Sequence, residues 1–143
     1  MATPTTGNVL SLEVASPKGL MLSTQATSVQ APGTAGEFGV LPGHLPILAG
    51  IRPGVLKYVT GGKSHVAAVG RGYFEGGPDR ALLLVSDFQT PESIDVDAVK
   101  KELADAEKEL KSFGEAHEGA AFETVNEKVQ WAQARLLAAT LPH

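Results

Sequence analysis

The sequence predicts an α+β chain in which an N-terminal antiparallel β-sandwich precedes a C-terminal antiparallel helical hairpin. Three observations predict this class. Up to residue 90, short segments with strand-like composition alternate with turns rich in glycine. From residue 94, apolar residues recur in alternating steps of three and four. Residues 1–90 hold 14 of the 16 glycines, whereas residues 91–143 hold eleven acidic and six basic groups. We therefore expect two modules, a sandwich over 1–88 and a hairpin over 92–140.

The strands are predicted from alternation and from the turns between them. Leu10, Leu12 and Val14 point to one face of a first strand over residues 8–14, while Ser11 and Glu13 point to the other. Further strands are predicted at residues 27–30, 55–60, 65–69, 72–75 and 81–86. Residues 17–19, 61–62 and 76–79 have the composition of turns. Short strands at such spacing favour an antiparallel sandwich or barrel.

Residues 31–46 are the most distinctive segment, with four glycines, three prolines, one carboxylate (Glu37) and one imidazole (His44). Glycine opens backbone angles closed to other residues, and proline removes a donor, so tight turns and short extended pieces are expected here and helix is not. Pro42 and Gly43 suit the central positions of a type II turn that presents His44 after the bend. On turn statistics alone, this segment merely joins two strands.

Two apolar stripes of matched spacing predict two helices that face each other. The first stripe is Val96, Val99, Leu103, Ala106, Leu110 and Phe113, and the second is Phe122, Val125, Val129, Ala132, Leu136 and Ala139. A link bounded by Gly114 and Gly119 joins them. Helices derive most of their stability from tertiary packing, so a hairpin with two narrow stripes must lie on the sandwich or on another protein.

Composition excludes several classes of function. The chain has no cysteine, which excludes disulfides and thiolate metal sites, and its four scattered histidines predict no metal site. A net charge of −4 argues against nucleic-acid binding, and no apolar run approaches the ~20 residues that cross a bilayer. No nucleophile motif is present, and the glycine-rich segments do not continue into a phosphate-binding loop. We therefore expect no enzyme, no cofactor and no direct membrane insertion.

Residues 31–46 resemble the signature of the ε subunit of F-type (rotary, proton-translocating) ATP synthases, in which a Pro-Gly-(x)-x-Gly-Glu-(Phe/Leu)-Gly-(x)-x-Pro-Gly-His segment recurs. Four further segments resemble segments of this family and follow in the same order. They are Ile51-Arg-Pro-Gly-Val-Leu56, Val69-Gly-Arg-Gly-Tyr-Phe-Glu75, Leu83-Leu-Val-Ser-Asp87 and Ile94-Asp95. The resemblance covers about residues 8 to 140. It implies a flattened β-sandwich and a non-catalytic central-stalk subunit, which binds the γ subunit and the c-ring and so couples ring rotation to the catalytic head.

The resemblance also implies roles for individual residues. Glu37 and His44, with their flanking Gly36 and Gly43, match family positions that contact polar loops of the c-ring. We expect both side chains on turns at one edge of the sandwich. The competing interpretation is that they are ordinary solvent-facing turn residues.

The first helix begins where some family members bind ATP through an Ile/Leu-Asp-x-x-Arg-Ala motif. Asp95 matches that motif, but Ala98 stands where its arginine would be, and Asp97 adds a carboxylate. We therefore expect no nucleotide binding, and Asp95 should instead cap the helix.

In this family the second helix often carries several basic residues that meet an acidic motif on the catalytic β subunits when the hairpin extends as an inhibitory arm. The resemblance thus implies the catalytic α/β subunits as further partners of this arm. Here the second helix offers Lys128 and Arg135, which supports that role weakly. The single tryptophan, Trp131, should pack against the sandwich or the first helix.

The N-terminus lacks the features of a signal peptide or of a mitochondrial presequence, which favours a bacterial chain or an already processed one. The resemblance implies a peripheral place on the cytoplasmic face of the bacterial inner membrane. The alternative function is a free-standing β-sandwich adaptor or ligand-binding module with a helical tail.

Overall fold

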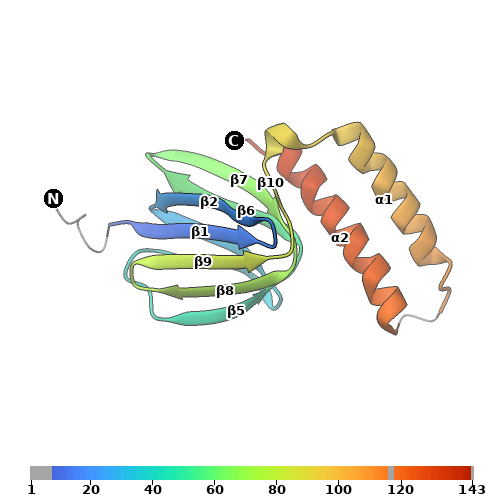
Figure 1. The fold of residues 1–143 in the computed structure, drawn as a ribbon, viewed down its shortest axis with the longest axis horizontal. Helices are drawn as coiled ribbons and strands as arrows, with labels where there is room; N and C mark the ends of the chain where they lie inside the picture. Colours follow the sequence, from blue (N-terminus) through green and yellow to red (C-terminus); the bar gives the residue numbers. More distant parts are fainter. Residues whose placement is uncertain (1–7, 116–117, 143) are drawn as a thin grey trace.

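The computed structural model describes residues 8–115 and 118–142, which form a β-sandwich followed by two helices (Figure 1). The strands are β1 (Leu10–Ser16), β2 (Gly19–Ala26), β3 (Ser28–Gly33), β4 (Gly36–Val40), β5 (Ile47–Ile51), β6 (Gly54–Thr60), β7 (Lys63–Val69), β8 (Gly72–Gly77), β9 (Arg80–Val85) and β10 (Phe88–Gln89). A short 3₁₀ turn, η1 (Pro91–Ser93), leads to α1 (Val96–Lys111) and α2 (Ala120–Thr140). The predicted class, a sandwich and then a helical pair, is confirmed.

All six predicted strands are present, and the structure adds four more. The added strands are β2, β4, β5 and β10. β2 lacks a regular alternation of apolar and polar residues, and β5 is a short apolar run with a glycine, so neither shows a clear period of two. β4 falls inside the segment that was expected to be mostly turns.

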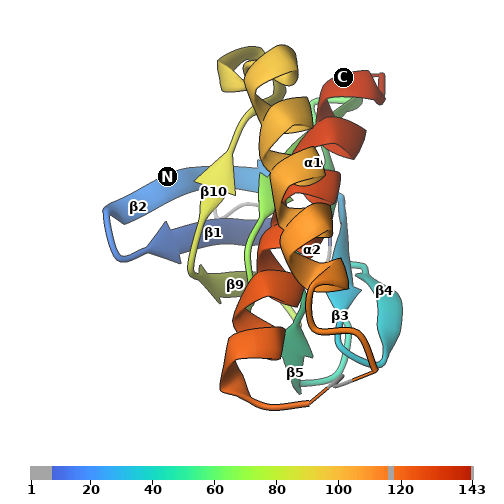
Figure 2. The same cartoon turned by 90° about the vertical axis from the view of Figure 1, so that its right-hand side faces the viewer.

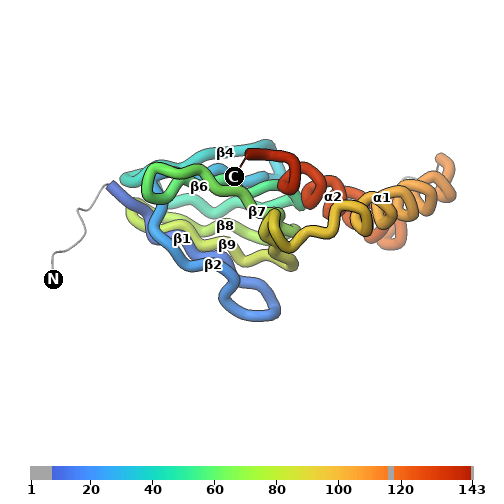
Figure 3. The backbone as a smooth tube through the Cα atoms, turned by 90° about the horizontal axis from the view of Figure 1, so that it is seen from above, coloured from blue at the N-terminus to red at the C-terminus, as the bar shows by residue number. Residues whose placement is uncertain are grey.

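The strands follow the order β10-β7-β6-β3-β5-β8-β9-β1-β2, and β4 pairs with β3 outside this path. The sheet folds into two layers, with β6 and β7 in one and β8, β9 and β1 in the other (Figure 3). Every pair among the described strands is antiparallel except β1 with β9, which is parallel. The predicted antiparallel sandwich therefore includes one parallel pair, which the sequence analysis did not foresee.

The sandwich core lies between the layers. It includes the fully buried side chains of Leu10, Leu12, Val14, Leu56 and Phe74. The predicted inward face of the first strand is confirmed, because its three apolar residues are buried while Ser11 and Glu13 are exposed.

A second apolar cluster joins the hairpin to the sandwich. It includes Val55 of β6, Val66 and Ala68 of β7, and Ala132 and Ala138 of α2. Figure 2 shows α2 closer to the sandwich than α1, so α2 is covered on two sides. Besides the predicted stripe, α2 buries Ala134 and Ala138, and their small side chains allow α2 to approach the sheet closely.

Candidate interaction surfaces

Glu37 lies on the outer edge of the sandwich, in β4 rather than on a turn. β3 and β4 form a hairpin whose last pair, Gly33 and Gly36, is joined through Thr34 and Ala35. Gly36 has φ +127°, a conformation that L side chains rarely adopt, so glycine is required here. Glu37 is exposed and pairs across the strands with Pro32. The expectation that it sits on a turn is wrong, because the β3–β4 register extends beyond it.

The loop between β4 and β5 contains the predicted type II turn. His44 donates its backbone N–H to the carbonyl of Leu41 at 3.1 Å, which closes a four-residue turn around Pro42 and Gly43. Gly43 has φ +89°, as the third residue of such a turn requires. Its own N–H donates to the carbonyl of Pro78 at 2.6 Å, so the loop is tied to the turn between β8 and β9. This turn is confirmed.

The side chain of His44 is turned toward the protein. Its Nδ1 lies 2.8 Å from the carbonyl oxygen of Leu45, and that oxygen can only accept, so Nδ1 carries the proton. Nε2 is buried and has no hydrogen-bond partner among the described residues. A Cβ on Gly76 would lie 2.9 Å from Cε1 of His44, so the ring occupies space that only a glycine in β8 leaves open.

The structure does not bring Glu37 and His44 together. Both lie along the β4 edge, but Glu37 is near its first residue and His44 lies beyond its last. At a rise of about 3.3 Å per residue, Glu37 and Val40 alone are roughly 10 Å apart along the strand. Glu37 and His44 can therefore contribute to two separate contacts along this edge, but they do not form one joint site.

Sequence reasoning missed an apolar surface on the outer face of the sheet. The register places Gly50 of β5 beside Tyr73 of β8, Tyr73 beside Leu84 of β9, Leu84 beside Ala15 of β1, and Ala15 beside Leu20 of β2. Tyr73, Leu84 and Leu20 are 64%, 51% and 61% exposed. We call these five residues the outer row. The three large side chains of this row therefore remain exposed on the outer face of the sheet.

Asp95 caps α1 as predicted. Its Oδ1 accepts the N–H of Ala98 at 3.1 Å, which satisfies one of the free donors in the first turn. Asp97 adds a second carboxylate in that turn, and Ala98 provides no cation. A phosphate group at the start of α1 would therefore meet backbone N–H donors, but it would also meet the negative charges of two carboxylates.

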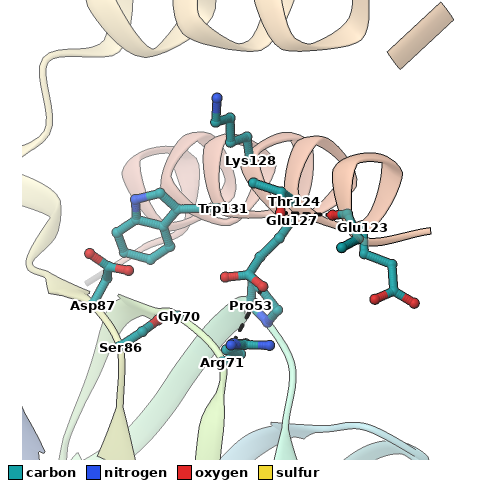
Figure 4. Close-up of a pocket in the computed structure, with 11 residues that line it drawn as sticks. Pro53, Gly70, Arg71, Ser86, Asp87, Glu123, Thr124, Glu127, Lys128 and Trp131 are labelled. Carbon is teal, nitrogen blue, oxygen red and sulfur yellow. Dashed lines mark hydrogen bonds and ion pairs between the residues drawn. The ribbon is translucent and has the colours of Figure 1, made fainter. Parts of the chain in front are cut away.

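A cleft separates the first half of α2 from the end of the sandwich (Figure 4). It encloses about 450 Å³. One ion pair crosses it, between Nε of Arg71 and Oε1 of Glu127 at 3.4 Å. Figure 4 shows Lys128 pointing away from the sandwich, while Glu127 reaches toward it. The first half of α2 thus stands off the sheet, whereas the second half packs closely through its alanines.

The two basic residues of α2 differ in their contacts, because Arg135 is held by neighbouring side chains whereas Lys128 faces solvent. The guanidinium of Arg135 lies 2.9 Å from Oε2 of Glu102 on α1 and 5.1 Å from the centre of the Trp131 ring. Lys128 is exposed. Trp131 packs against the cluster that joins the hairpin to the sheet, as expected.

Neither a metal site nor a membrane span is found in residues 8–115 and 118–142. No three His, Asp or Glu side chains gather there in a group that could hold an ion. Neither of the two helices is long and apolar enough to cross a bilayer.

Comparisons with known proteins identify the family. The model of the "ATP synthase, Delta/Epsilon chain, beta-sandwich domain" matches residues 9–91. The ATP synthase epsilon chain of Anaeromyxobacter dehalogenans strain 2CP-C is 37% identical over 91% of this chain and 97% of its own length. That of Thermodesulfovibrio yellowstonii is 41% identical over 73% of this chain and 74% of its own length.

Solved structures show the same fold. A chain in the Euglena gracilis mitochondrial ATP synthase structure (OSCP/F1/c-ring) aligns with a TM-score of 0.79 and 19% identity, over 99% of this chain and 87% of that chain. A chain in the central stalk/c-ring structure of the Tetrahymena thermophila enzyme aligns with a TM-score of 0.59 and 12% identity, over 92% and 96%. These matches do not favour a free-standing adaptor. The protein therefore belongs to the family of ATP synthase epsilon chains, which are subunits of the synthase complex and not enzymes by themselves.

Proposed function

We propose that this chain is a central-stalk subunit that links the γ subunit to the c-ring and so couples ring rotation to the catalytic head. One observation carries the proposal: the sandwich has two separate exposed surfaces that its own fold does not use. These are the outer row and the β4 edge with its following loop. A subunit that transmits torque needs two such contacts.

The outer row is the surface that we assign to γ. A permanent interface is richer in apolar and aromatic contacts than a transient one. Tyr73 and Leu84 lie side by side on neighbouring strands and give a rigid apolar centre of that kind. Strand side chains keep fixed positions, so this face can transmit force without bending.

The β4 edge is the surface that we assign to the c-ring, in line with the resemblance. Glu37 is exposed there and can meet polar groups of a partner. Gly36 and Gly43 give the backbone the positive φ values that shape the edge, and His44 belongs to the loop beside it.

We assign the hairpin, residues 92–140, the role of an arm and the sandwich, residues 1–88, the role of the stalk module. In the docked position Arg135 is occupied by Glu102 and Trp131. Contact between this arginine and the catalytic α or β subunits therefore requires that pair to break first. The complex would hold the chain on the cytoplasmic face of a bacterial inner membrane.

The test is co-purification of the full chain with γ and with the ring from solubilised membranes. Tyr73→Ser with Leu84→Ser should lower the yield of γ, because two exposed apolar anchors are lost. Leu137→Ser, at another half-exposed leucine on α2, is the matched control and should leave the yield unchanged. Equal recovery of γ with both variants would contradict the assignment of the outer row as the γ-binding surface.

Glu37→Lys tests the ring contact in the same way, with Glu107→Lys on the exposed face of α1 as its control. We expect ATP-driven proton pumping to weaken in the first variant and to be normal in the second. Failure of the unchanged chain to recover either partner would contradict the proposed function as a whole.

A further inference from the structure

We propose that Arg71 is a brace that sets the tilt of the helical hairpin on the sandwich, through its ion pair with Glu127 of α2. The hairpin is otherwise attached to the sheet at one end, so its other end rocks when the pair is broken while the attached end stays in place. The inference goes beyond the proposed function and needs none of its partners, because it concerns contacts within this chain.

The apolar contact between hairpin and sheet is confined to one end of the hairpin. The members that α1 contributes to the cluster joining them are Val96, Val99 and Leu103, all in its first half. The first member that α2 contributes is Trp131, in its second half. We call these two halves the attached end, and the described residues between 108 and 130 the tip. The tip contributes no residue to this cluster, and Figure 3 shows the hairpin projecting beyond the sandwich.

The tip meets the sandwich through charge instead of apolar packing. The cleft of about 450 Å³ between them is crossed by the ion pair of Arg71 with Glu127, at 3.4 Å. The other charged residues that line this cleft are Asp87 on the sandwich side and Glu123 and Lys128 on α2. None of these three forms an ion pair within the part of the chain that the structure describes. The Arg71–Glu127 pair is therefore the direct charged contact that ties the tip to the sandwich.

The backbone holds Arg71 in place between two glycines. Its carbonyl accepts the N–H of Ser86 at 2.8 Å. A Cβ on Gly70 would overlap Oγ of Ser86. A Cβ on Gly72 would overlap the carbonyl oxygen of Leu84. Glycine on both sides lets this segment press against the end of β9, so the arginine projects toward α2 from backbone that has little room to shift.

An exposed ion pair is weak, but the one-ended attachment lets a weak contact decide the tilt. The side chains of Arg71 and Glu127 are 72% and 38% exposed, so the pair favours the tilt that forms it by about fivefold at most. For two tilts that otherwise have equal free energy, roughly four-fifths of the molecules then adopt the braced one, against roughly half without the pair. Salt at about 1 M removes the same preference, because the screening length falls to about 3 Å.

The experiment measures distances in the full chain by pulsed electron double resonance. The chain has no cysteine, so two introduced cysteines carry the only spin labels. Both label pairs share Glu13→Cys, at an exposed position of β1. The tip pair adds Lys111→Cys in the last turn of α1, and the attached-end pair adds Lys100→Cys near its start; both lysines are exposed. We expect one main distance from each pair at low salt.

Removal of the brace should change the tip pair alone. In Arg71→Gln the main tip distance should fall from roughly four-fifths to roughly half of the distribution, while the attached-end distance stays unchanged. About 1 M NaCl should do the same to the chain with its brace intact. Arg71→Glu with Glu127→Arg should restore the main distance, because the pair is formed again with its charges exchanged. Arg52→Gln is the matched control, because this arginine lines the adjoining part of the cleft but donates to the carbonyl of Pro53, and it should change neither distance.

Three results would overturn the inference. The first is an unchanged tip distance in Arg71→Gln and at high salt, which would mean that apolar packing sets the tilt. The second is equal broadening of both label pairs, which would mean that the whole hairpin leaves the sandwich. The third is failure of the exchanged pair to restore the main distance, which would mean that the two residues act separately. The salt series alters no residue of the brace, so it decides the question even where a variant misfolds.

Discussion

A chain that ends at Thr90 should fold cooperatively by itself, but at a lower melting temperature than the full chain. This cut follows β10 and leaves the main core between the layers complete. It removes α2, which covers Val55, Val66 and Ala68 on the surface of β6 and β7. The experiment therefore separates the stability of the sandwich from the contribution of the docked hairpin.

The size of the effect can be worked from these three side chains. Full burial of a valine is worth about 1.5–3 kcal/mol, and an alanine contributes roughly 0.8 kcal/mol. Loss of α2 uncovers one side while the neighbouring strand residues remain, so about half of that sum, roughly 2–3 kcal/mol, should be lost. For a domain of this size, 1 kcal/mol corresponds to about 4–8 °C, which gives a fall of roughly 10–20 °C.

Thermal unfolding followed by circular dichroism measures the fall, and two matched substitutions show its cause. Val66→Thr buries a hydroxyl under α2 in the full chain and should cost about 1–2 kcal/mol there. In the shortened chain the hydroxyl meets water, so the cost should disappear. Val69→Thr, on the same strand but inside the main core, should cost the same in both chains.

The reasoning would be refuted by aggregation or a broad, non-cooperative transition in the shortened chain. It would also be refuted if Val66→Thr cost the same with and without the hairpin. The first result would mean that the sandwich is not a module. The second would mean that α2 does not cover β7 in solution.

Three further predictions concern single positions. Titration calorimetry with Mg-ATP should show no binding, because Asp97 repels phosphate and Ala98 supplies no cation; saturable heat at micromolar nucleotide would contradict this. Gly43→Ala should lower the free energy of unfolding by about 1–2 kcal/mol, because φ is +89° there. Gly77→Ala, with open space and no positive φ, should cost less in the same denaturant titration. Burial and, less strongly, Glu92 raise the pKa of Tyr58 above 10.0, so the neutral phenol is favoured in the folded state. The unfolded phenol then ionises first, and the free energy of unfolding should fall more steeply above pH 10 than it does in Tyr58→Phe; equal slopes would contradict it.

Local features of this protein are readable from the sequence. The type II turn at Pro42 and Gly43 depends on two adjacent residues, and the cap at Asp95 depends on a side chain and a donor three residues away. The helices follow from a spacing repeated within each segment. In each case the deciding free energy lies within a few neighbouring residues.

The orientation of the candidate site residues is not readable in this way. Glu37 belongs to β4 because that segment pairs with β3, and this pairing competes with a run of turns of similar composition. His44 turns inward because Gly76 of β8, which is 32 residues further along the chain, leaves space for its ring. Both outcomes depend on contacts between distant segments.

The sequence by itself determined the class, the order of the modules, the turn, the cap and the helical stripes, because these depend on short-range preferences that the tertiary fold did not reverse. Only the tertiary structure decided which apolar residues remain outside. The outer row needs five strands in a register that includes a parallel pair, and the second buried face of α2 needs a sheet beneath it. An isolated leucine or alanine has the same chemistry in a core as on a surface. Which of the two it occupies depends on the segments that long-range pairing brings against it.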